Sequence, residues 1–459
     1  MNVCVIGTGY VGLVTGTCLA FLGRSVTCVD IDEAKISQLR EGQAPFYEPR
    51  LSALLTGVIE RGLLSFSNNL EQSVQGAEIV FIAVGTPPQA SGKPDLSAVE
   101  AVARSIGKAL NSDHHRVIVN KSTVPIGSGN WVEMLIKEGI RANQSNGSSQ
   151  PLSFSVASNP EFLREGTAVH DTLYPDRIVI GASDAHAVER LRALYDPIIE
   201  QTFTPPPSSP RPAGFTAVPV VTTDLASAEM IKYAANAFLA TKISFANEIA
   251  NICERVGADI REVVRGFGLD SRIGPRFLNA GVGWGGSCFG KDLSALIDVA
   301  QEYGYEPHLL RSTVAVNRRQ RQVVVKKLQE TLKILKGRTI GLLGLAFKPE
   351  TDDLRDAPAL EIAKQLIEMG AHVKAYDPVA NDASSKLVGD LKIDYCPDAL
   401  TLSEGCHAIV VITEWDEFQN LNAQEIGTLM NTKVIIDGRN VMDRETFEAA
   451  GFRYCGVGR

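Results

Sequence analysis

The feature that most constrains this chain is a glycine triplet, Gly7, Gly9 and Gly12, in the sequence G-T-G-Y-V-G. The triplet follows a short β-branched run at residues 2–6 and opens a segment with helical character. Glycines at this spacing permit a tight turn, let backbone amides approach a pyrophosphate, and let the helix pack closely on the strand. The pattern predicts a strand–turn–helix unit that binds a dinucleotide. The alternative is a plain tight turn in a flavodoxin-like sheet.

The next predicted strand, at residues 25–30, ends in Asp30. A carboxylate at this place accepts hydrogen bonds from the ribose hydroxyls of NAD and repels the 2′-phosphate of NADP. The combination of glycine turn and acid favours NAD as the cofactor.

The N-terminal part alternates short strands with helical stretches, which predicts a parallel, doubly wound sheet. The expected strands are residues 2–6, 25–30, 79–84, 116–120, 153–158 and 177–181. A second α/β pattern begins at Lys336, with strands expected at 338–343, 372–376, 408–413 and 433–437 and a helix at 357–369. The two α/β parts look like a loose repeat.

The second α/β part begins G-L-L-G-L-A at Gly341 and lacks the third glycine of the fingerprint. Charged residues follow, so this half is expected to hold something other than a dinucleotide. Lys348 and Arg355 are candidate phosphate ligands; the alternative is a solvated charged loop.

Residues 224–256 contain neither proline nor glycine, and Gly257 follows them. The segment predicts one helix about 50 Å long. Helices of this length commonly bridge domains or build subunit interfaces. The expected organisation is α/β, two Rossmann-like doubly wound domains joined by a central helical domain. The expected domains are residues 1–215, 216–330 and 331–459.

The chain has 459 residues, of which 44% are hydrophobic and 21% charged, a composition typical of an ordinary globular protein. The net charge of −8 argues against nucleic acid as the main partner. The uncharged first 23 residues suggest a signal peptide or membrane span, but their glycines and the lack of a basic start argue against both. Eight scattered cysteines without a C-x-x-C pair indicate a reducing, cytoplasmic setting. No metal-ligand spacing is present, and no catalytic metal is expected.

Cys288 lies within G-V-G-W-G-G-S-C-F-G-K-D, where five glycines surround one cysteine. Helical spacing begins directly after it, so the thiol is expected at a helix N-terminus, where the dipole and Lys291 favour the thiolate. The glycines on both sides would let a substrate approach closely. These features make Cys288 a candidate nucleophile; the alternative is a buried cysteine in a turn.

Lys232 and Asn236 lie four residues apart on the predicted long helix and share a face. Together they offer a cation and an amide to a developing oxyanion, although helical Lys and Asn are usually solvated. Polar segments also follow three predicted strands: residues 159–166 (N-P-E-F-L-R-E-G), 121–125 (K-S-T-V-P) and 84–87 (V-G-T-P). Open α/β sheets bind ligands at such strand ends.

Together these segments, with F-Y-E-P at 46–49, F-K-P-E-T-D-D-L-R and D-G-R-N at 437–440, resemble the UDP-glucose 6-dehydrogenase family. The resemblance covers nearly the whole chain. It implies an NAD-binding N-terminal domain, a helical dimer-forming middle and a C-terminal domain that holds UDP. It also implies a homodimer through the long helix.

The resemblance implies a double oxidation at C6 of the glucose moiety, with two NAD reduced per sugar. Cys288 would trap the intermediate aldehyde as a thiohemiacetal, and a second oxidation would give a thioester that water hydrolyses to UDP-glucuronate. Lys232 and Asn236 would stabilise the oxyanion stages. Asp292 would act as base or position Lys232. Glu161 and Thr123 would order water or relay a proton, and which carboxylate is the general base stays open.

The resemblance also implies two sets of binding residues. The substrate set comprises Glu161, Phe162, Leu163, Arg164, Lys232, Asn236, Phe277, Gly281, Lys348, Arg439, and Arg272, which the family lends to the neighbouring subunit. The cofactor set comprises Gly7, Gly9, Tyr10, Val11, Gly12, Asp30, Lys35, Thr86, Thr123, Glu165 and Arg355. The segments at 143–151 and 204–214 match nothing in the family and are expected to be surface loops, the second of them flexible.

Three other functions remain as alternatives. GDP-mannose and UDP-N-acetylhexosamine 6-dehydrogenases share the architecture, and the run at 276–281 (R-F-L-N-A-G) favours UDP-glucose. A non-catalytic NAD-binding sensor would not need a glycine-framed cysteine. An NAD-dependent sugar epimerase needs a Y-x-x-x-K pair, which is not placed after a suitable strand.

Overall fold

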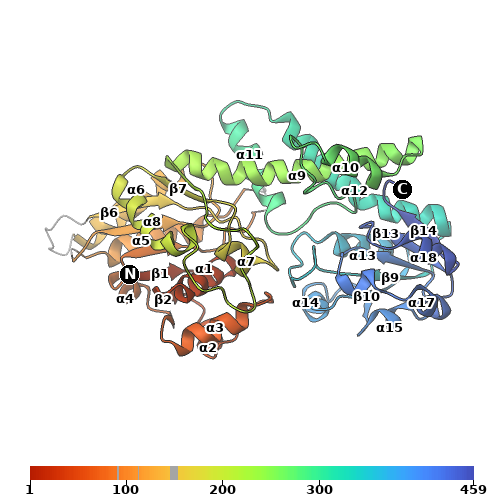
Figure 1. The fold of residues 1–459 in the computed structure, drawn as a ribbon, viewed down its shortest axis with the longest axis horizontal. Helices are drawn as coiled ribbons and strands as arrows, with labels where there is room; N and C mark the ends of the chain where they lie inside the picture. Colours follow the sequence, from red (N-terminus) through yellow and green to blue (C-terminus); the bar gives the residue numbers. More distant parts are fainter. Residues whose placement is uncertain (90–92, 112, 145–152) are drawn as a thin grey trace. The chain divides into compact units, whose positions relative to one another are not determined.

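The computed structural model describes residues 1–89, 93–111, 113–144 and 153–459 (Figure 1). They form two compact units, Met1–Ala234 and Ala235–Arg459. The boundary between the units falls within the long helix α9 (Leu225–Val256).

The first unit is built on one sheet, whose described strands follow the order β3-β2-β1-β4-β5-β6-β7-β8. The order of the first six is that of a dinucleotide-binding Rossmann sheet. The strands are β1 (Asn2–Ile6), β2 (Ser25–Val29), β3 (Leu64–Ser67), β4 (Ile79–Ile82), β5 (Arg116–Asn120), β6 (Phe154–Ser158), β7 (Ile178–Ala182) and β8 (Val220–Thr223).

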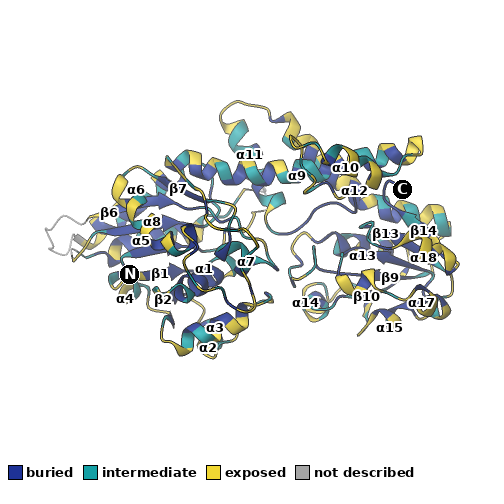
Figure 2. Cartoon of the chain, viewed as in Figure 1, coloured by how far each residue is buried: buried dark blue, intermediate teal, exposed yellow. Residues whose placement is uncertain are grey.

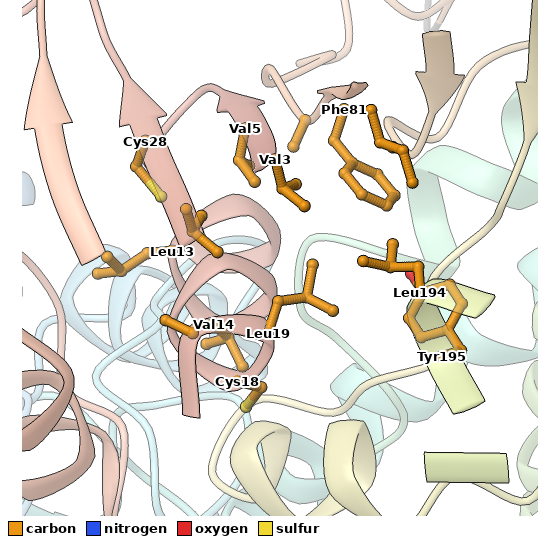
Figure 3. Packing of buried hydrophobic residues seen from close by; sticks show 14 of the residues in the cluster. Val3, Val5, Leu13, Val14, Cys18, Leu19, Cys28, Phe81, Leu194 and Tyr195 are labelled. Atoms are coloured by element: carbon orange, nitrogen blue, oxygen red, sulfur yellow. The ribbon is translucent and has the colours of Figure 1, made fainter. Parts of the chain in front are cut away.

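Both faces of this sheet are covered, because the inner strands are apolar on both sides. In β1, Val3 and Val5 face one core, while Cys4 and Ile6 face the other. Figure 3 shows how side chains of β1, α1 and α8 meet in the first core. This core is covered by α1 (Tyr10–Phe21), α2 (Glu33–Arg40), α3 (Leu51–Glu60), α7 (Ala168–Leu173) and α8 (Ala185–Ile199); the opposite core is covered by α4 (Leu70–Gln75), α5 (Ser97–Ala109) and α6 (Ser128–Gln144).

The sheet departs from the predicted all-parallel pattern at one place, because β7 runs antiparallel to β6. The connection between them consists of the loop at 159–167, the six-residue helix α7 and residues 174–177, in place of the long crossover helix that usually joins parallel strands. Strand β8 then pairs parallel to β7.

The second unit contains a six-stranded parallel sheet in the order β11-β10-β9-β12-β13-β14 among its described strands. This is the order of the first six strands of the N-terminal sheet, so the predicted repeat and the α/β fold class are confirmed. The strands are β9 (Thr339–Leu343), β10 (His372–Tyr376), β11 (Ile393–Tyr395), β12 (Ala408–Val411), β13 (Val434–Asp437) and β14 (Arg453–Gly456).

Helices cover both faces of the second sheet, whose strands are largely buried (Figure 2). One core involves α12 (His308–Leu332), α13 (Pro358–Glu368) and α14 (Asn381–Leu387); the other involves α15 (Ala399–Ser403), α16 (Asp416–Gln419), α17 (Ala423–Leu429) and α18 (Arg444–Ala449).

The central region is helical, as predicted. Helix α9 begins where the Asp224 carboxylate accepts the backbone amide of Ser227 at 2.8 Å, and it ends before Gly257, whose φ is +77°. The α10 (Ile260–Gly268), α11 (Phe289–Glu302) and α12 helices follow. Domain boundaries at 215/216 and 330/331 stay a prediction.

The proline-rich stretch at 204–214 is packed against the first unit. Ser209 is buried, and its carbonyl accepts the Tyr174 hydroxyl at 2.8 Å. Arg211 donates to the Phe203 carbonyl at 2.7 Å. These contacts anchor a segment that composition alone marks as a flexible excursion. Of the other unmatched segment, residues 143 and 144 end α6 and the remainder lies outside the described residues. No helix in the described chain is long and apolar enough to cross a membrane.

Candidate active site

The turn after β1 has the geometry that its glycines predict. Gly7 has φ of +102°, and a Cβ there would lie 2.6 Å from the Ala83 carbonyl oxygen. A Cβ at Gly12 would collide with the Gly7 carbonyl, so the helix packs directly on the turn. At Gly9, by contrast, a Cβ would meet open space, and the first turn of α1 has no acidic residue or side-chain cap. The amides of this helix start therefore suit a pyrophosphate.

Asp30 lies at the end of β2 as predicted. Its Oδ2 accepts the backbone amide of Thr8 at 2.9 Å and the Thr8 hydroxyl at 2.6 Å, while Lys35 forms an ion pair at 3.4 Å. Burial alone would raise the pKa of Asp30, but the Thr8 and Asp32 hydrogen bonds and the Lys35 charge hold it below the ordinary value. The carboxylate stays ionised and suits ribose hydroxyls.

The other proposed cofactor residues lie in the first unit, except Arg355, which lies in the second. Thr86 follows β4 and donates to the Thr123 carbonyl at 2.9 Å, which joins the V-G-T-P and K-S-T-V-P loops. The ring of Tyr10 stacks on Phe46 at 4.6 Å. Val11 and Glu165 are partly buried.

The loop at 159–166 is anchored by Glu48 of the F-Y-E-P segment. The buried carboxylate of Glu48 accepts the backbone amides of Gly166 and Ala168 at 2.6 and 2.8 Å. The Tyr10 hydroxyl accepts the Gly166 amide as well, at 2.8 Å. These contacts tie the loop to α1, a structural role for Glu48 that sequence order gives no means of predicting.

Lys232 and Glu161 form a buried ion pair in the first unit. Their side chains are each 6% exposed, with Nζ 2.8 Å from Oε1, and Nζ also donates to the Glu161 carbonyl at 2.8 Å. The Thr123 hydroxyl donates to the same Oε1 at 3.4 Å. The second oxygen, Oε2, is buried without a hydrogen-bond partner among the described residues. The structure thus brings Thr123, Glu161 and Lys232 together, and leaves one carboxylate oxygen available as an acceptor.

Phe162, Leu163 and Arg164 continue the same loop. The Arg177 guanidinium lies 3.6 Å from the centre of the Phe162 ring, and Leu163 packs at the edge of the first core. The Arg164 guanidinium is held by two hydrogen bonds to Asp171, at 2.9 and 2.7 Å. This pairing fixes the loop against α7.

In the second unit, Cys288 is the N-cap residue of α11. All eight cysteines lie in the described residues; Cys288 is exposed, six are buried and Cys455 is intermediate. Cys288 thus lies at the start of a 14-residue helix, as predicted, and the residue is exposed; its role as a nucleophile stays a prediction.

Asp292 lies one helical turn after Cys288 and is 1% exposed. It accepts the Asn236 side-chain amide at 2.6 Å and the Lys291 ammonium at 2.8 Å. The charge of Lys291, expected to favour the Cys288 thiolate, is therefore directed into an ion pair. Asp292 orients Asn236 on α9, where Asn236 lies one turn from Lys232.

The glycines around Cys288 pack against protein, a different role from the expected approach of substrate. At Gly286, with φ of +84°, a Cβ would lie 2.7 Å from the Phe347 ring, and a Cβ at Gly285 would collide with the Asp356 carbonyl. The Gly286 amide donates to the Arg355 carbonyl at 3.0 Å. The glycines thus let the cysteine loop lie directly on the segment that follows β9.

Helix α12 holds the other side of the loop. Asn317 accepts the Trp284 amide at 2.8 Å and donates to the Trp284 carbonyl at 2.9 Å. Gln320 donates to the Gly281 carbonyl at 2.7 Å. Sequence reasoning missed these helical amides, since their spacing resembles an ordinary buried helix face.

The remaining residues proposed for the sugar nucleotide lie in the second unit, whereas Glu161, Phe162, Leu163, Arg164 and Lys232 lie in the first. The Arg439 guanidinium donates to the carbonyls of Ile412, Gly283 and Phe347 and pairs with Glu414 at 3.1 Å. It therefore joins the cysteine loop to the ends of the sheet. Lys348 lies beside the Phe347 ring, Arg355 pairs with Asp353, Phe277 has φ of +63°, and Arg272 is 86% exposed and pairs with Asp270.

In the second sheet, the acidic residue that corresponds to Asp30 is bonded to protein and is not open to a ribose. Asp377, at the end of β10, is 2% exposed. Its carboxylate accepts the amides of Leu345 and Ala346 at 2.7 and 3.0 Å, and those of Val379 and Ala380 at 3.0 Å. Because backbone amides already occupy the Asp377 carboxylate, the structure supports the expectation that this half holds a different ligand. Within the described chain, no group of three His, Cys, Asp or Glu residues is placed to hold a metal ion.

The N-terminal Rossmann sheet with its glycine turn and Asp30 defines a dinucleotide-binding α/β protein. Three family models match the chain: the NAD-binding domain of the UDP-glucose/GDP-mannose dehydrogenase family at residues 1–199, its central domain at 226–319 and its UDP-binding domain at 341–444. The chain belongs to the UDP-glucose/GDP-mannose dehydrogenase family, and its cofactor is NAD. The resemblance found in the sequence is confirmed.

Known relatives cover the whole chain. UDP-glucose 6-dehydrogenase TuaD of Bacillus subtilis is 46% identical and matches over 100% of this chain and 93% of its own length. The structure of a UDP-glucose dehydrogenase from Pyrobaculum islandicum is similar, with a TM-score of 0.88, 37% identity and coverage of 100% and 97%. The UDP-D-ManNAc dehydrogenase of Pyrococcus horikoshii is similar at a TM-score of 0.83, 27% identity and coverage of 100% and 99%.

Proposed function

We propose that this enzyme oxidises C6 of UDP-glucose twice, yielding UDP-glucuronate, through a thiohemiacetal and a thioester on Cys288. The observation that carries the proposal is the exposed Cys288 at the start of α11, in a chain whose other cysteines are buried or partly buried. A thiol suits a four-electron oxidation, because the thiohemiacetal presents a second C–H bond for oxidation without releasing a free aldehyde. The named UDP-glucose 6-dehydrogenases at 41–46% identity support the choice of sugar.

Bound NAD supplies the hydride acceptor for both oxidations. The glycine turn at Gly7 and Gly9 and the ionised Asp30 would hold its pyrophosphate and ribose. The Lys232 ammonium and the Asn236 amide would stabilise negative charge on the C6 oxygen, as alkoxide and then as the oxyanion of thioester hydrolysis. Asp292 would position Asn236 through the hydrogen bond between them.

Hydrolysis of the thioester needs a base for water. Glu161 fits this role better than Asp292, since its Oε2 has no hydrogen-bond partner among the described residues, while both oxygens of Asp292 accept strong donors. Thr123 would help to order the water through its contact with Glu161. The remaining predicted substrate and cofactor residues keep the roles that the family resemblance implies.

The proposal is tested by the number of NADH formed per UDP-glucose when the sugar is limiting. We expect two NADH per sugar, measured by absorbance, and a loss of UDP-glucuronate formation of at least about a thousandfold in C288A. C455A, which changes the partly buried cysteine of β14, is the control and should retain activity. A value of one NADH per sugar, or full UDP-glucuronate formation by C288A, would refute the thioester route.

A second candidate is a 6-dehydrogenase of another nucleotide sugar, which the similarity to the UDP-D-ManNAc dehydrogenase of Pyrococcus horikoshii favours. Turnover of UDP-N-acetylhexosamine or GDP-mannose in place of UDP-glucose would support it. NAD binding without turnover of any of these sugars would support the sensor instead. We further propose a cytosolic setting, supported by six buried free cysteines, which are typical of reducing compartments.

A further inference from the structure

We propose that Lys121 is a positioning residue for Glu161: its buried ammonium fixes the loop that carries this carboxylate and supplies positive charge that keeps it ionised. The inference rests on the proposed function, in which Glu161 activates the hydrolytic water. It deepens that function by assigning a role to a buried lysine that belongs to neither the predicted substrate set nor the predicted cofactor set.

The positional argument starts from two neighbouring strands. Lys121 directly follows β5 and Asn159 directly follows β6, and their preceding residues are paired in the parallel register. The Lys121 ammonium lies 3.0 Å from Asn159 Oδ1 and 3.4 Å from the Asn159 carbonyl oxygen. Two residues further along each segment, the Thr123 hydroxyl meets Glu161. The Lys121–Asn159 contact therefore joins the two segments immediately before the point where Thr123 and Glu161 come together.

The electrostatic argument starts from the neutral partners of the Lys121 ammonium. The residue is 8% exposed, and in the described chain its ammonium is bonded to the two oxygens of Asn159, with the Phe81 ring 5.9 Å away. A buried ammonium that lacks an ion-pair partner is costly, and a neutral donor would make the same contact with Asn159 more cheaply. The charge itself is therefore the feature that needs an explanation.

The surrounding charges provide one. The charges that act on the Glu161 carboxylate are Lys232 on α9 and Lys121 after β5, with the Thr123 hydroxyl beside them. Glu229, which lines a pocket with Lys232, accepts the amides of Gly127 and Gly129 at 2.7 and 2.8 Å, and burial raises its pKa. Lys121 thus adds its charge to that of Lys232. Without Lys121, the Glu161 carboxylate would keep only the charge of Lys232.

The directions of the pKa shifts agree with this arrangement of charges. Burial lowers the pKa of Lys121 to about 8, with Glu161 opposing the shift and Lys232 adding to it, so that the ammonium is mostly protonated at neutral pH. Burial alone would raise the pKa of Glu161, but Lys232 and then Lys121 hold it below the ordinary value. Removing the Lys121 charge must raise the pKa of Glu161, and the base is then protonated at a higher pH.

The test is the pH dependence of kcat in K121M, which removes the charge with little change of volume. We expect the acid limb of kcat to move up by about one pH unit, so that kcat on that limb falls about tenfold, with recovery at higher pH. The KM for NAD should stay within about twofold of the wild-type value, because the glycine turn and Asp30 are untouched. K121Q, which can still donate to Asn159 but has no charge, should show the same shift if K121M does not fold.

The matched control is Y195F. Tyr195 donates its hydroxyl to the same Asn159 Oδ1 at 2.7 Å, so this variant removes one buried hydrogen bond from Asn159 without changing charge. Its acid limb should stay where the wild-type limb lies. The inference is wrong if K121M and K121Q keep the wild-type limb, if they lose activity uniformly at every pH, or if Y195F shifts the limb equally. A wild-type yield of one NADH per sugar would overturn the proposed function and this inference with it, whereas a yield of two with an unshifted K121M overturns this inference alone.

Discussion

At the scale of single residues, we propose that Asp30 determines which dinucleotide the N-terminal domain accepts. In D30A the acceptor for the ribose hydroxyls is lost, and loss of hydrogen bonds to a charged group corresponds to a Kd for NAD about ten- to a hundredfold higher. Binding of NADP should weaken less or improve, because the repulsion of its 2′-phosphate is removed. The measurement is the ratio of the two dissociation constants, obtained by titration calorimetry.

T8V is the control, since it removes one hydroxyl that donates to Asp30 but keeps the carboxylate. It should still reject NADP. The pKa of Asp30 in the folded protein lies below the ordinary value for Asp. The carboxylate is therefore ionised at and above the ordinary pKa, and it is protonated only as the pH falls through the lower, folded-state pKa. The preference for NAD should accordingly be constant across the neutral and mildly acidic range. A D30A variant that discriminates as strongly as wild type would contradict this assignment.

At the scale of elements, the cysteine loop depends on glycines that have no room for a side chain. G286A combines a φ of +84° with a Cβ 2.7 Å from the Phe347 ring, and we expect it to lower the free energy of unfolding by about 2–4 kcal/mol. G274A is the matched control, because Gly274 has φ of +72° but open space around its Cβ. It should lose about 1–2 kcal/mol. Denaturant unfolding measures both, and equal losses would show that close packing against Phe347 is unimportant.

The strands that the sequence failed to predict are β3, β8, β11 and β14, and each lies at an edge of its sheet. Inner strands such as β4 and β12 are buried on both faces and appear as apolar runs. Edge strands are partly exposed: β8 has the sequence V-V-T-T without a fully buried residue, and β11 has only three residues. Their pairing comes from the neighbouring strand and leaves little trace in composition.

The candidate site divides along similar lines. Gly7, Asp30 and Cys288 were predictable, because each belongs to a local motif beside a strand end or helix start. The contacts of Glu48 with Gly166 and of Lys121 with Asn159 join segments 118 and 38 residues apart. Such contacts depend on strand order, which no single motif encodes.

At the scale of the whole molecule, the long helix suggests self-association. Phe238, Phe245 and Ile252 recur every seven residues on α9, and they are 66%, 50% and 49% exposed in the single chain. Seven residues are close to two helical turns, so these side chains form one apolar stripe. We propose a homodimer through this stripe. Light scattering should give about twice the chain mass of 49.5 kDa for the wild type and the chain mass for F238E/F245E, because a buried unpaired carboxylate strongly opposes association. A wild-type monomer, or a charged variant that remains dimeric, would contradict the proposal.

The dimer also bears on catalysis, since the family resemblance implies that Arg272 serves the neighbouring subunit's site. Arg272 is 86% exposed and pairs with Asp270, a surface position suited to such a role.

R272A and C288A dimers should each be strongly impaired. When the two variants are co-expressed, a mixed dimer contains one site with an intact Cys288 in one chain and an intact Arg272 from the other. If Arg272 acts between subunits, the purified mixed dimer should recover about half the wild-type kcat, because one of its two sites is whole. If Arg272 acts within its own chain, each site of the mixed dimer lacks one group and activity stays at the level of the parent variants. Purifying the mixed dimer through two different affinity tags makes the comparison quantitative.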